Sequence, residues 1–504
     1  MKKKFISILL TLSIILSYGF SMCIQAFASS ETSEENTSWY NAQYWSLNSS
    51  IRGKLDGKYR YYKIYVPRRG TLQVSFSHDR AEDGEWRIHI EKIINDGQNP
   101  KTLGTIDVNA SGRNATVMPL LGVDSGEYYI CVGGDAEPSY TLTNSFIATE
   151  SYEIEDNSSE FKANLFPLNS SIGGNGFYRV DYKDYSDYYQ IDVNEKGIIE
   201  FDFSHETGTE GRLYFQIKKD VGDGSTSEIY DGYVLAHDKK IVHPKIGVEP
   251  GIYYVEISFF EGSNQLEYKI SNRFVKDEKY ESEKNDTFYN ANAIELNSYI
   301  KGAITNLESE SLSSLFANGY DCFEIKNSKG KYITVRFSHD KSEKGEWSVQ
   351  IYEKVNGEYV YITGEPVKTS GGTVSFTAIK SNKSNLFIKV SSSSSAFGPG
   401  GSATFIEYKI SAAQYVKKPT GLTAKSKATS VTLSWNKVSG AKGYEVQRYS
   451  NGKWTTVKTT ALTKTTVKGL QTGKTYKFRV KAYKIFDGRK AYSSASKTVT
   501  TRTK

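Results

Sequence analysis

The sequence predicts an all-β chain built from tandem antiparallel β-sandwiches. Its 37 tyrosines and 24 phenylalanines, set against only 10 prolines and 3 methionines, favour half-buried pleated sheets. Apolar and polar residues alternate with a period of two in short segments, as in residues 198–203, where Ile199, Phe201 and Phe203 share one face. No long helical pattern separates these segments, so we expect sandwiches and not an α/β fold.

The N-terminus predicts a secretory signal peptide. Lys2, Lys3 and Lys4 precede a mostly apolar segment over residues 5–24, and small residues then predict cleavage after Ala28. A retained membrane anchor is the alternative interpretation. No later segment is apolar enough to span a bilayer, so residues 1–28 predict a secreted, extracellular protein.

Two cysteines follow the signal peptide. Cys131 and Cys322 belong to different repeats, and each lies in an apolar segment typical of a strand. We therefore predict buried free thiols, with stability derived from hydrophobic cores and not from a disulfide framework.

Three copies of one pattern follow the signal peptide in register. The motif Phe-Ser-His-Asp/Glu begins at residues 76, 203 and 337, and Leu-Asn-Ser begins at residues 47, 168 and 296. An asparagine precedes each of these leucines by eleven residues, at Asn36, Asn157 and Asn285. The predicted repeats are residues 29–148 (repeat 1), 149–276 (repeat 2) and 277–415 (repeat 3), followed by a fourth domain at 416–504. Each of the three repeats has roughly 120 residues, which is enough to bury a core of its own.

Each copy contains the same succession of predicted strands. A glycine introduces the first clear strand, which ends in the Phe-Ser-His motif, as expected for a turn before a strand. A Gly-x-Tyr-Tyr segment follows at residues 126–129 and 251–254, and is weakened at 385–387. A strand beginning with Tyr140, Tyr268 or Tyr408 closes each copy.

These copies resemble the bacterial pre-peptidase C-terminal domain, a β-sandwich related to the collagen-binding domain of clostridial collagenases. The resemblance rests on the acidic opening, on Asp-Tyr-Tyr at 187–189 (Asp-Cys-Phe at 321–323), on the glycine-led strand and on Gly-x-Tyr-Tyr. It covers about three quarters of the chain, and repeat 1 departs from it with Arg-Tyr-Tyr at 60–62. We therefore expect three jelly-roll-like repeats.

The C-terminal domain, residues 416–504, resembles a fibronectin type III domain. Pro419 opens it, Trp435 ends a predicted strand, and another strand begins at Gly443. Alternating apolar residues then run from Tyr476 to Ala482. The resemblance places Trp435 in the core and Tyr476 at the tyrosine corner.

Three recurring histidines, His78, His205 and His339, are each followed by an acid, and a carboxylate can orient an imidazole as a base. Adjacent strand residues point to opposite faces, however, so we expect structural roles for these histidines. No serine-hydrolase elbow and no His-Glu-x-x-His pair is present, and the lack of a cysteine pair in any repeat disfavours zinc. The sequence therefore predicts no catalytic residue and no enzyme.

The acidic openings of repeats 2 and 3 predict a cation site. In an extended segment, residues two apart share one side, which gathers oxygen donors suited to calcium. The candidate ligands are Glu281, Glu283, Asn285, Asp286, Glu153, Glu155 and Asn157. The resemblance to collagen-binding domains also implies calcium at these positions. Repeat 1 has Thr32 at the first position and lacks one carboxylate, and a solvated acidic linker is the alternative interpretation.

Charge and aromatic residues point to the partners. Residues 416–504 contain 17 lysines and 4 arginines but only two acids, whereas residues 29–415 have a net charge of −15. Such a basic domain favours an anionic surface and not nucleic acid, which a secreted chain rarely meets; solubility alone is the alternative. Two aromatic clusters could form a ligand platform, and most of their members are expected in the core: Trp39, Tyr40, Tyr44 and Trp45; Tyr182, Tyr185, Tyr188 and Tyr189.

The combined prediction is a secreted, monomeric, non-catalytic binding or adhesion protein of the bacterial surface or extracellular matrix, associated non-covalently with the wall. Its ligand would be an anionic wall polymer, a glycan or a collagen-like protein. Two alternatives remain: an accessory binding subunit of a separate secreted hydrolase (peptidase or glycosidase), and an enzyme with an unrecognised site.

Overall fold

The protein is described by a computed structural model. The described residues are 29–30, 36–79, 83–93, 99–112, 115–136, 138–176, 186–206, 212–235, 245–260, 266–304, 320–339, 346–368, 373–392, 406–486 and 489–504. The predicted signal peptide and its cleavage site lie outside these residues.

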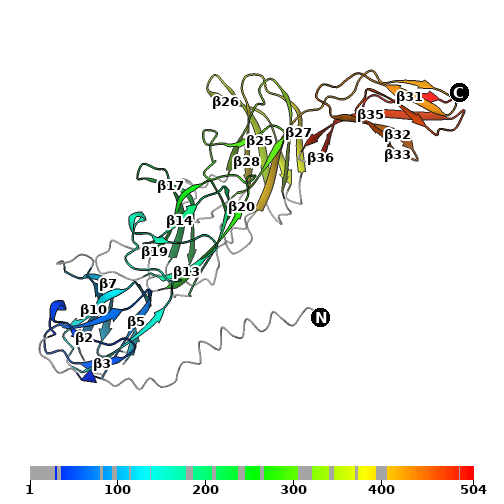
Figure 1. The fold of residues 1–504 in the computed structure, drawn as a ribbon. Coiled ribbons are helices and arrows are strands. Elements are labelled where there is room, and N and C mark those ends of the chain that lie inside the picture. Colours follow the sequence, from blue (N-terminus) through cyan, green and yellow to red (C-terminus); the bar gives the residue numbers. More distant parts are fainter. Residues whose placement is uncertain are drawn as a thin grey trace, which may run out of the picture.

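Four β-sandwiches follow one another in a row along the molecule (Figure 1). The predicted all-β fold class is thus confirmed. Two short 3₁₀ helices, η1 (Trp39–Asn41) and η2 (Glu160–Lys162), interrupt the strands. Within the part of the chain that the structure describes, no helix has the length and apolar character needed to cross a membrane.

Repeat 1 consists of two sheets. The first has the order β1-β3-β11-β5-β8, with β9 also paired to β5, and the second has the order β2-β4-β10-β6-β7. The strands are β1 (Ser29–Ser30), β2 (Gln43–Tyr44), β3 (Ser50–Gly53), β4 (Arg60–Val66), β5 (Gly70–His78), β6 (Glu85–Lys92), β7 (Lys101–Asn109), β8 (Ala115–Val117), β9 (Leu121–Val123), β10 (Gly126–Gly134) and β11 (Tyr140–Ala148).

Repeat 2 has the sheets β13-β20-β15-β18 and β12-β14-β19-β16-β17. Its strands are β12 (Asn164–Leu165), β13 (Ser171–Asn175), β14 (Ser186–Val193), β15 (Gly197–His205), β16 (Arg212–Asp220), β17 (Thr226–Leu235), β18 (Lys245–Val248), β19 (Gly251–Phe260) and β20 (Glu267–Lys276).

Repeat 3 has the sheets β22-β29-β24-β27 and β21-β23-β28-β25-β26, so the strand order of repeat 2 recurs. Its strands are β21 (Asn292–Ile294), β22 (Ser298–Ile304), β23 (Tyr320–Ile325), β24 (Tyr332–His339), β25 (Glu346–Val355), β26 (Glu358–Lys368), β27 (Thr373–Lys380), β28 (Leu386–Ser392) and β29 (Ile406–Gln414).

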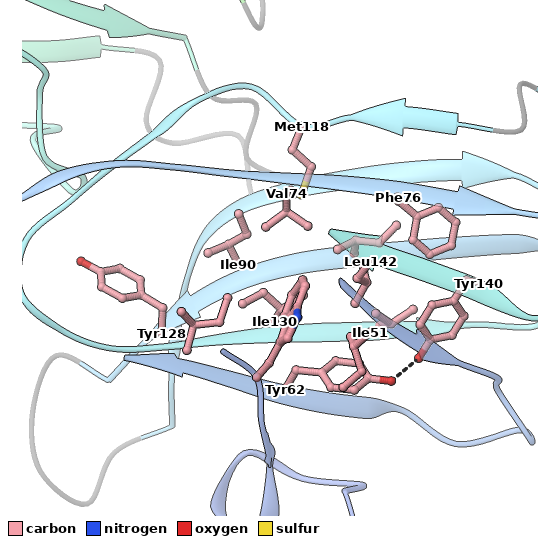
Figure 2. Close-up of a cluster of buried hydrophobic side chains, with 14 of the residues drawn as sticks. Ile51, Tyr62, Val74, Phe76, Ile90, Met118, Tyr128, Ile130, Tyr140 and Leu142 are labelled. Atoms are coloured by element: carbon pink, nitrogen blue, oxygen red, sulfur yellow. Dashed lines mark hydrogen bonds between the residues drawn. The ribbon is translucent and has the colours of Figure 1, made fainter. Parts of the chain in front are cut away.

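Each repeat buries a core of its own between its two sheets. In repeat 1, alternate residues of facing strands, including Val74, Phe76 and Ile130, point inward and interdigitate (Figure 2). Full burial of such a side chain contributes about 1.5–3 kcal/mol. The hydroxyls of Tyr62 and Tyr140 meet at 2.9 Å at one end of this core (Figure 2), which satisfies two polar groups that burial would otherwise penalise.

The recurring Leu-Asn-Ser motif has a structural role. Its asparagine adopts a left-handed backbone conformation, with φ of 54°, 60° and 69° at Asn48, Asn169 and Asn297, a conformation that asparagine tolerates well. The Asn48 N–H donates to Asn144 Oδ1 at 2.7 Å, and the Phe146 N–H donates to Asn48 Oδ1 at 2.7 Å. The motif therefore fixes the turn that leads into β3, β13 or β22.

The linker that opens each later repeat packs on a glycine of the preceding repeat. The Glu155 N–H donates to the Gly122 carbonyl at 3.5 Å, and the Glu283 N–H donates to the Gly247 carbonyl at 3.1 Å. A Cβ atom on Gly122 would lie 1.6 Å from the Glu153 carbonyl oxygen, and one on Gly247 would lie 1.8 Å from that of Glu281. Only glycine permits this approach at the two junctions.

The C-terminal sandwich packs the sheet β30-β31-β34 against β33-β32-β35-β36, with β37 also paired to β35. Trp435 is buried in its core, and the Gln471 N–H donates to the Tyr476 hydroxyl at 2.9 Å. The strands are β30 (Thr423–Ser426), β31 (Ser430–Ser434), β32 (Gly443–Ser450), β33 (Lys453–Thr460), β34 (Lys464–Lys468), β35 (Thr475–Phe486), β36 (Arg489–Tyr492) and β37 (Val499–Arg502).

The two cysteines are free and buried, as predicted. Burial raises the pKa of Cys131 and that of Cys322 to about 12. Both thiols are therefore protonated and unreactive at neutral pH.

Candidate metal centres

Two groups of three carboxylates lie where repeats 2 and 3 begin. At the second junction, Glu281 and Glu283 of the linker meet Asp321 of β23. At the first junction, the corresponding linker residues meet Asp187 of β14. In each group, one oxygen from every carboxylate lies within 4.8 Å of the others. We refer to these groups as the second and first junction clusters.

In the second junction cluster, hydrogen bonds orient the Glu281 carboxylate. Its Oε1 accepts from the Ala303 N–H at 2.7 Å, and its Oε2 accepts from Asn285 Nδ2 at 3.1 Å and from the Tyr408 hydroxyl at 2.8 Å. The Tyr408 hydroxyl also contacts Asp321 Oδ2 at 2.5 Å. A Cβ atom on Gly302 would lie 2.3 Å from Glu281 Oε1, so the carboxylate rests directly against the backbone of β22.

The first junction cluster repeats this arrangement. Glu153 Oε1 accepts from the Asn175 N–H at 2.7 Å, and Oε2 accepts from Asn157 Nδ2 at 3.0 Å and from the Tyr189 hydroxyl at 2.5 Å. The Tyr268 hydroxyl contacts both Glu153 Oε2, at 3.1 Å, and Asp187 Oδ2, at 2.7 Å, just as the Tyr408 hydroxyl contacts Glu281 and Asp321 in repeat 3. The two junctions therefore hold one constellation, built twice.

Burial and mutual repulsion disfavour the charged forms of these acids. Burial, followed by the charge of Glu283, raises the pKa of Glu281, and burial with the charge of Asp321 does the same for Glu283. Burial also raises the pKa of Glu153. Two unit charges within 4.8 Å of each other repel by at least about 3 kcal/mol at an effective dielectric constant of ~20. Each cluster is thus stable with bound protons or with a cation.

The donor set fits a hard cation. Asn157 and Asn285 are 1% and 0% exposed, and the Oδ1 atom of each is buried without a hydrogen-bond partner. Each cluster thus combines three carboxylates with a buried amide oxygen that lacks a donor. All of these atoms are oxygens, which suit calcium better than zinc or copper, whose sites use histidine or cysteine.

The structure brings the predicted linker residues Glu281, Glu283 and Asn285 together, and likewise Glu153, Glu155 and Asn157. The remaining candidate is Asp286, whose Oδ2 lies 3.8 Å from Lys284 Nζ. Burial is the main cause that raises the pKa of Glu283 and of Asp321, and the charge of Asp286 adds to it. Sequence reasoning missed the strand carboxylates Asp187 and Asp321. Their signal was the recurring Asp-Tyr-Tyr or Asp-Cys-Phe motif, which occurs in register in repeats 2 and 3.

Repeat 1 differs because Arg60 stands where the other repeats have Asp187 and Asp321. Arg60 is only 6% exposed, and its Nη2 lies 3.0 Å from Asp56 Oδ1. A fixed positive charge there is incompatible with a calcium ion. Residues 32–35, which include the predicted departure at Thr32, lie outside the described residues; Asn36 is buried at the position of Asn157 and Asn285.

The three histidines pack against core aromatics or backbone. The His78 ring lies 4.5 Å from the Trp86 ring, and the His339 ring stacks on Trp347 at 5.4 Å. The Nδ1 atoms of His78 and His205 lie 2.9 and 2.6 Å from the carbonyl oxygens of their following residues. These contacts are those of structural side chains.

The structure divides the predicted aromatic clusters between core and surface. Trp45 and Tyr189 are core residues, whereas Tyr40 and Tyr44 are exposed. Trp39 and Tyr188 are half-buried, and Tyr182 and Tyr185 lie outside the described residues.

Comparison with known proteins assigns the last sandwich. Residues 417–499 match the family model of the fibronectin type III domain. The C-terminal sandwich is a fibronectin type III domain. The positions of Trp435 and Tyr476 agree with this assignment.

Several solved structures are similar to parts of the chain. The fibronectin type III domain of human fibronectin type III domain containing protein 3 is 25% identical, with 18% of this chain and 85% of that chain covered and a TM-score of 0.16. The pre-peptidase C-terminal domain of collagenase from Bacillus anthracis is 18% identical, with 22% and 94% covered and a TM-score of 0.18. The comparison with curated proteins gave no match.

Proposed function

We propose that the protein is an extracellular, non-catalytic binding protein whose three repeats present aromatic side chains to a polymeric ligand. One observation carries this proposal. Tyr40, Phe161 and Tyr289 are 78%, 92% and 85% exposed, and each lies four residues after the buried asparagine that opens its repeat. The signal-peptide pattern of residues 1–28 supports the extracellular location.

Packing does not account for these rings. A single exposed apolar residue is ordinary. A large aromatic ring that is exposed to solvent at the same position of three repeats does not stabilise the fold. Side chains hold two of the three turns that carry the rings: Ser38 Oγ donates to Asn41 Oδ1 at 2.5 Å, and Thr287 Oγ1 donates to Asn290 Oδ1 at 2.5 Å. A ring on a fixed turn loses little entropy on binding.

Repeat 3 enlarges its ring into an aromatic surface. Phe288 packs on Tyr359 at 4.5 Å, and Tyr289 meets Tyr359 edge-on at 6.0 Å. Tyr361 of β26 is 53% exposed and contacts Tyr352, whose ring lies 5.0 Å from that of Phe288. Lys354 Nζ lies 5.5 Å from the Tyr289 ring. Such rings suit the flat apolar faces of sugars or the side chains of an extended fibrous protein.

Three equivalent sites in a row favour a repetitive ligand. Linked sites bind a polymer with an avidity that exceeds the affinity of each site, provided that the spacing permits simultaneous contact. The repeats are lined up along the molecule (Figure 1). Wall glycans and fibrous matrix proteins are polymers of this kind, so we propose an adhesive role at such a surface.

We also propose that the two junction clusters bind calcium. Glu153, Glu155, Asp187 and Asn157 would hold one ion. The equivalent ligands at the second junction are Glu281, Glu283, Asp321 and Asn285. The unpartnered amide oxygens and the raised pKa values of Glu153 and Glu281 support this proposal. Calcium supplies the positive charge that the clusters lack, and it ties each linker to a strand of its own repeat.

The binding proposal is tested with the variant Tyr40→Ser/Phe161→Ser/Tyr289→Ser. Binding of the purified protein to insoluble polymers is measured by co-sedimentation with peptidoglycan carrying its wall polymers, with chitin and with fibrillar collagen. The control is Ile147→Ser/Val221→Ser/Leu462→Ser, which removes three exposed apolar residues at unrelated positions.

We expect the unmodified protein to bind at least one polymer, the ring variant to bind it at least tenfold more weakly, and the control to bind normally. No binding to any of the three polymers, or equal binding by both variants, would contradict the proposal.

A further inference from the structure

One outer face of the fibronectin type III domain alternates cations with aromatic rings. Phe478, Val480 and Ala482 of β35 lie in the core, so the intervening residues point away from it. Neighbouring strands add further side chains to the same surface. We refer to this surface as the basic face, formed by Lys477, Arg479, Lys481, Tyr483, Tyr449, Trp454, Lys490 and Tyr492.

At one end of the basic face, a guanidinium lies over a ring. The Arg479 guanidinium is 4.3 Å from the Trp454 ring centroid, and its Nε donates to Gln447 Oε1 at 2.7 Å. Tyr449 pairs with Trp454 across β32 and β33, with their rings 5.2 Å apart, and Tyr449 is exposed. These contacts hold a cation and two rings in one surface.

The other end repeats the combination. Lys490 Nζ lies 4.6 Å from the Tyr483 ring, and the Tyr483 and Tyr492 rings are 5.9 Å apart. Glu445 lies between the two ends, where it accepts hydrogen bonds from Lys490 at 2.8 Å and from Tyr492 at 2.6 Å. The domain has only one other acid, Asp487, so the face keeps a strong positive charge.

We propose that the basic face binds an acidic polysaccharide. The cations pair with carboxylate, sulfate or phosphate groups, and the rings accept the apolar faces of sugar units. A neutral glycan would use the rings alone, and an anion without sugar rings would use the cations alone. The proposal rests on the extracellular role proposed above, and it adds a ligand class and a second set of residues.

The test uses the full chain and immobilised dextran sulfate, with uncharged dextran as the neutral counterpart of the same sugar backbone. One variant, Lys477→Gln/Lys481→Gln, removes two charges from the basic face, and Tyr449→Ala removes one ring. The control, Lys425→Gln/Lys464→Gln, removes two exposed lysines from the opposite sheet and leaves the net charge matched. Thermal melting checks that every variant is folded.

We expect salt-sensitive binding to dextran sulfate and none to dextran. The Lys477→Gln/Lys481→Gln variant should bind roughly tenfold more weakly and Tyr449→Ala several-fold more weakly, whereas the control should change little.

If the control variant bound dextran sulfate as weakly as Lys477→Gln/Lys481→Gln, the polymer would be attracted by the charge of the whole domain. That result would contradict a binding site on the basic face. Tighter binding of single-stranded DNA than of dextran sulfate would instead identify a nucleic-acid face. Polyphosphate bound as tightly as dextran sulfate, with Tyr449→Ala without effect, would overturn the sugar component. Because the basic face shares no residue with Tyr40, Phe161 and Tyr289, either proposal can fail while the other stands.

Discussion

At the residue scale, the junction clusters bury charges that need a counter-charge. Asp321 is buried beside Glu281 and Tyr408, and burial followed by the charge of Glu281 raises its pKa. An asparagine there keeps the shape and an acceptor for Tyr408 but removes the charge. Replacing Asp321 with asparagine therefore separates two effects on the free energy of unfolding. One is the cost of burying its charge without a cation, and the other is the stabilisation gained when calcium binds.

The variant Asp321→Asn should therefore be more stable than the unmodified protein in chelator, by about 1–3 kcal/mol, and should lose most of the stabilisation that calcium provides. Thermal melting in EDTA and in millimolar calcium measures both effects. The control is Glu358→Gln, which neutralises an exposed carboxylate in the same repeat. A variant less stable in EDTA, with an undiminished response to calcium, would contradict a metal role for Asp321.

The raised pKa values also predict the pH dependence of the metal-free protein. An acid whose pKa is higher in the folded state binds more protons there than in the unfolded chain. Its stabilising contribution is complete below the unfolded value, 4.5 for a glutamate, and is lost as the pH rises through the folded value.

In EDTA, the unmodified protein should therefore lose stability relative to Asp187→Asn/Asp321→Asn as the pH rises from 5 to 8. The difference between the two proteins cancels the opposite trend of ion-paired acids elsewhere, such as Glu256, whose ion pair with Lys218 lowers its pKa. Urea unfolding at several pH values measures this difference. If the difference in free energy of unfolding did not vary with pH, the pKa values of the cluster acids would not be raised in the folded protein, which would contradict the prediction.

At the element scale, the glycines of β9 and β18 determine how closely one repeat approaches the next. Replacing Gly122 and Gly247 with alanine places a methyl group inside the linker backbone. We expect each junction to be destabilised by about 1–3 kcal/mol, as in overpacked cores, and calcium affinity to fall because the linker ligands move. Calcium titration monitored by melting temperature tests this prediction, with Val221→Ala as an exposed control; an unchanged calcium response would contradict it.

The fibronectin type III domain offers a second prediction at this scale. Tyr476→Phe removes the hydroxyl that accepts from the Gln471 N–H and should cost about 1 kcal/mol of unfolding free energy. Tyr449→Phe, on an exposed tyrosine of the same sheet, should cost far less. Urea unfolding of the two variants gives the comparison. Equal losses of unfolding free energy in the two variants would contradict a stabilising role for the tyrosine corner.

Local patterns predicted the strands well, because residue alternation is a property of the strand itself. Residues 198–203 fall within β15, and the segment that closes each copy falls within β11, β20 or β29. The clusters were predicted only in part. Glu281 and Glu283 are neighbours in sequence, but Asp321 comes from a strand 40 residues further on, and only the sheet topology brings it to the linker.

At the scale of the whole molecule, the junctions determine whether the three rings act together. A calcium ion that joins each linker to its own repeat, on a backbone seated against the preceding repeat, should stiffen the row of sandwiches. Small-angle scattering should therefore show a narrower range of end-to-end distances in calcium than in EDTA, and Asp187→Asn/Asp321→Asn should show no such change. Identical scattering of the unmodified protein in the two conditions would contradict stiffening by calcium.

The most direct test of the account is calorimetric titration of the purified protein with calcium. The account predicts binding heat that divides between the two junctions: Asp187→Asn should remove one part, Asp321→Asn the other, and the double variant all of it, because Arg60 leaves repeat 1 without a site. No heat from the unmodified protein, or heat that persists in the double variant, would contradict calcium binding at the two junction clusters.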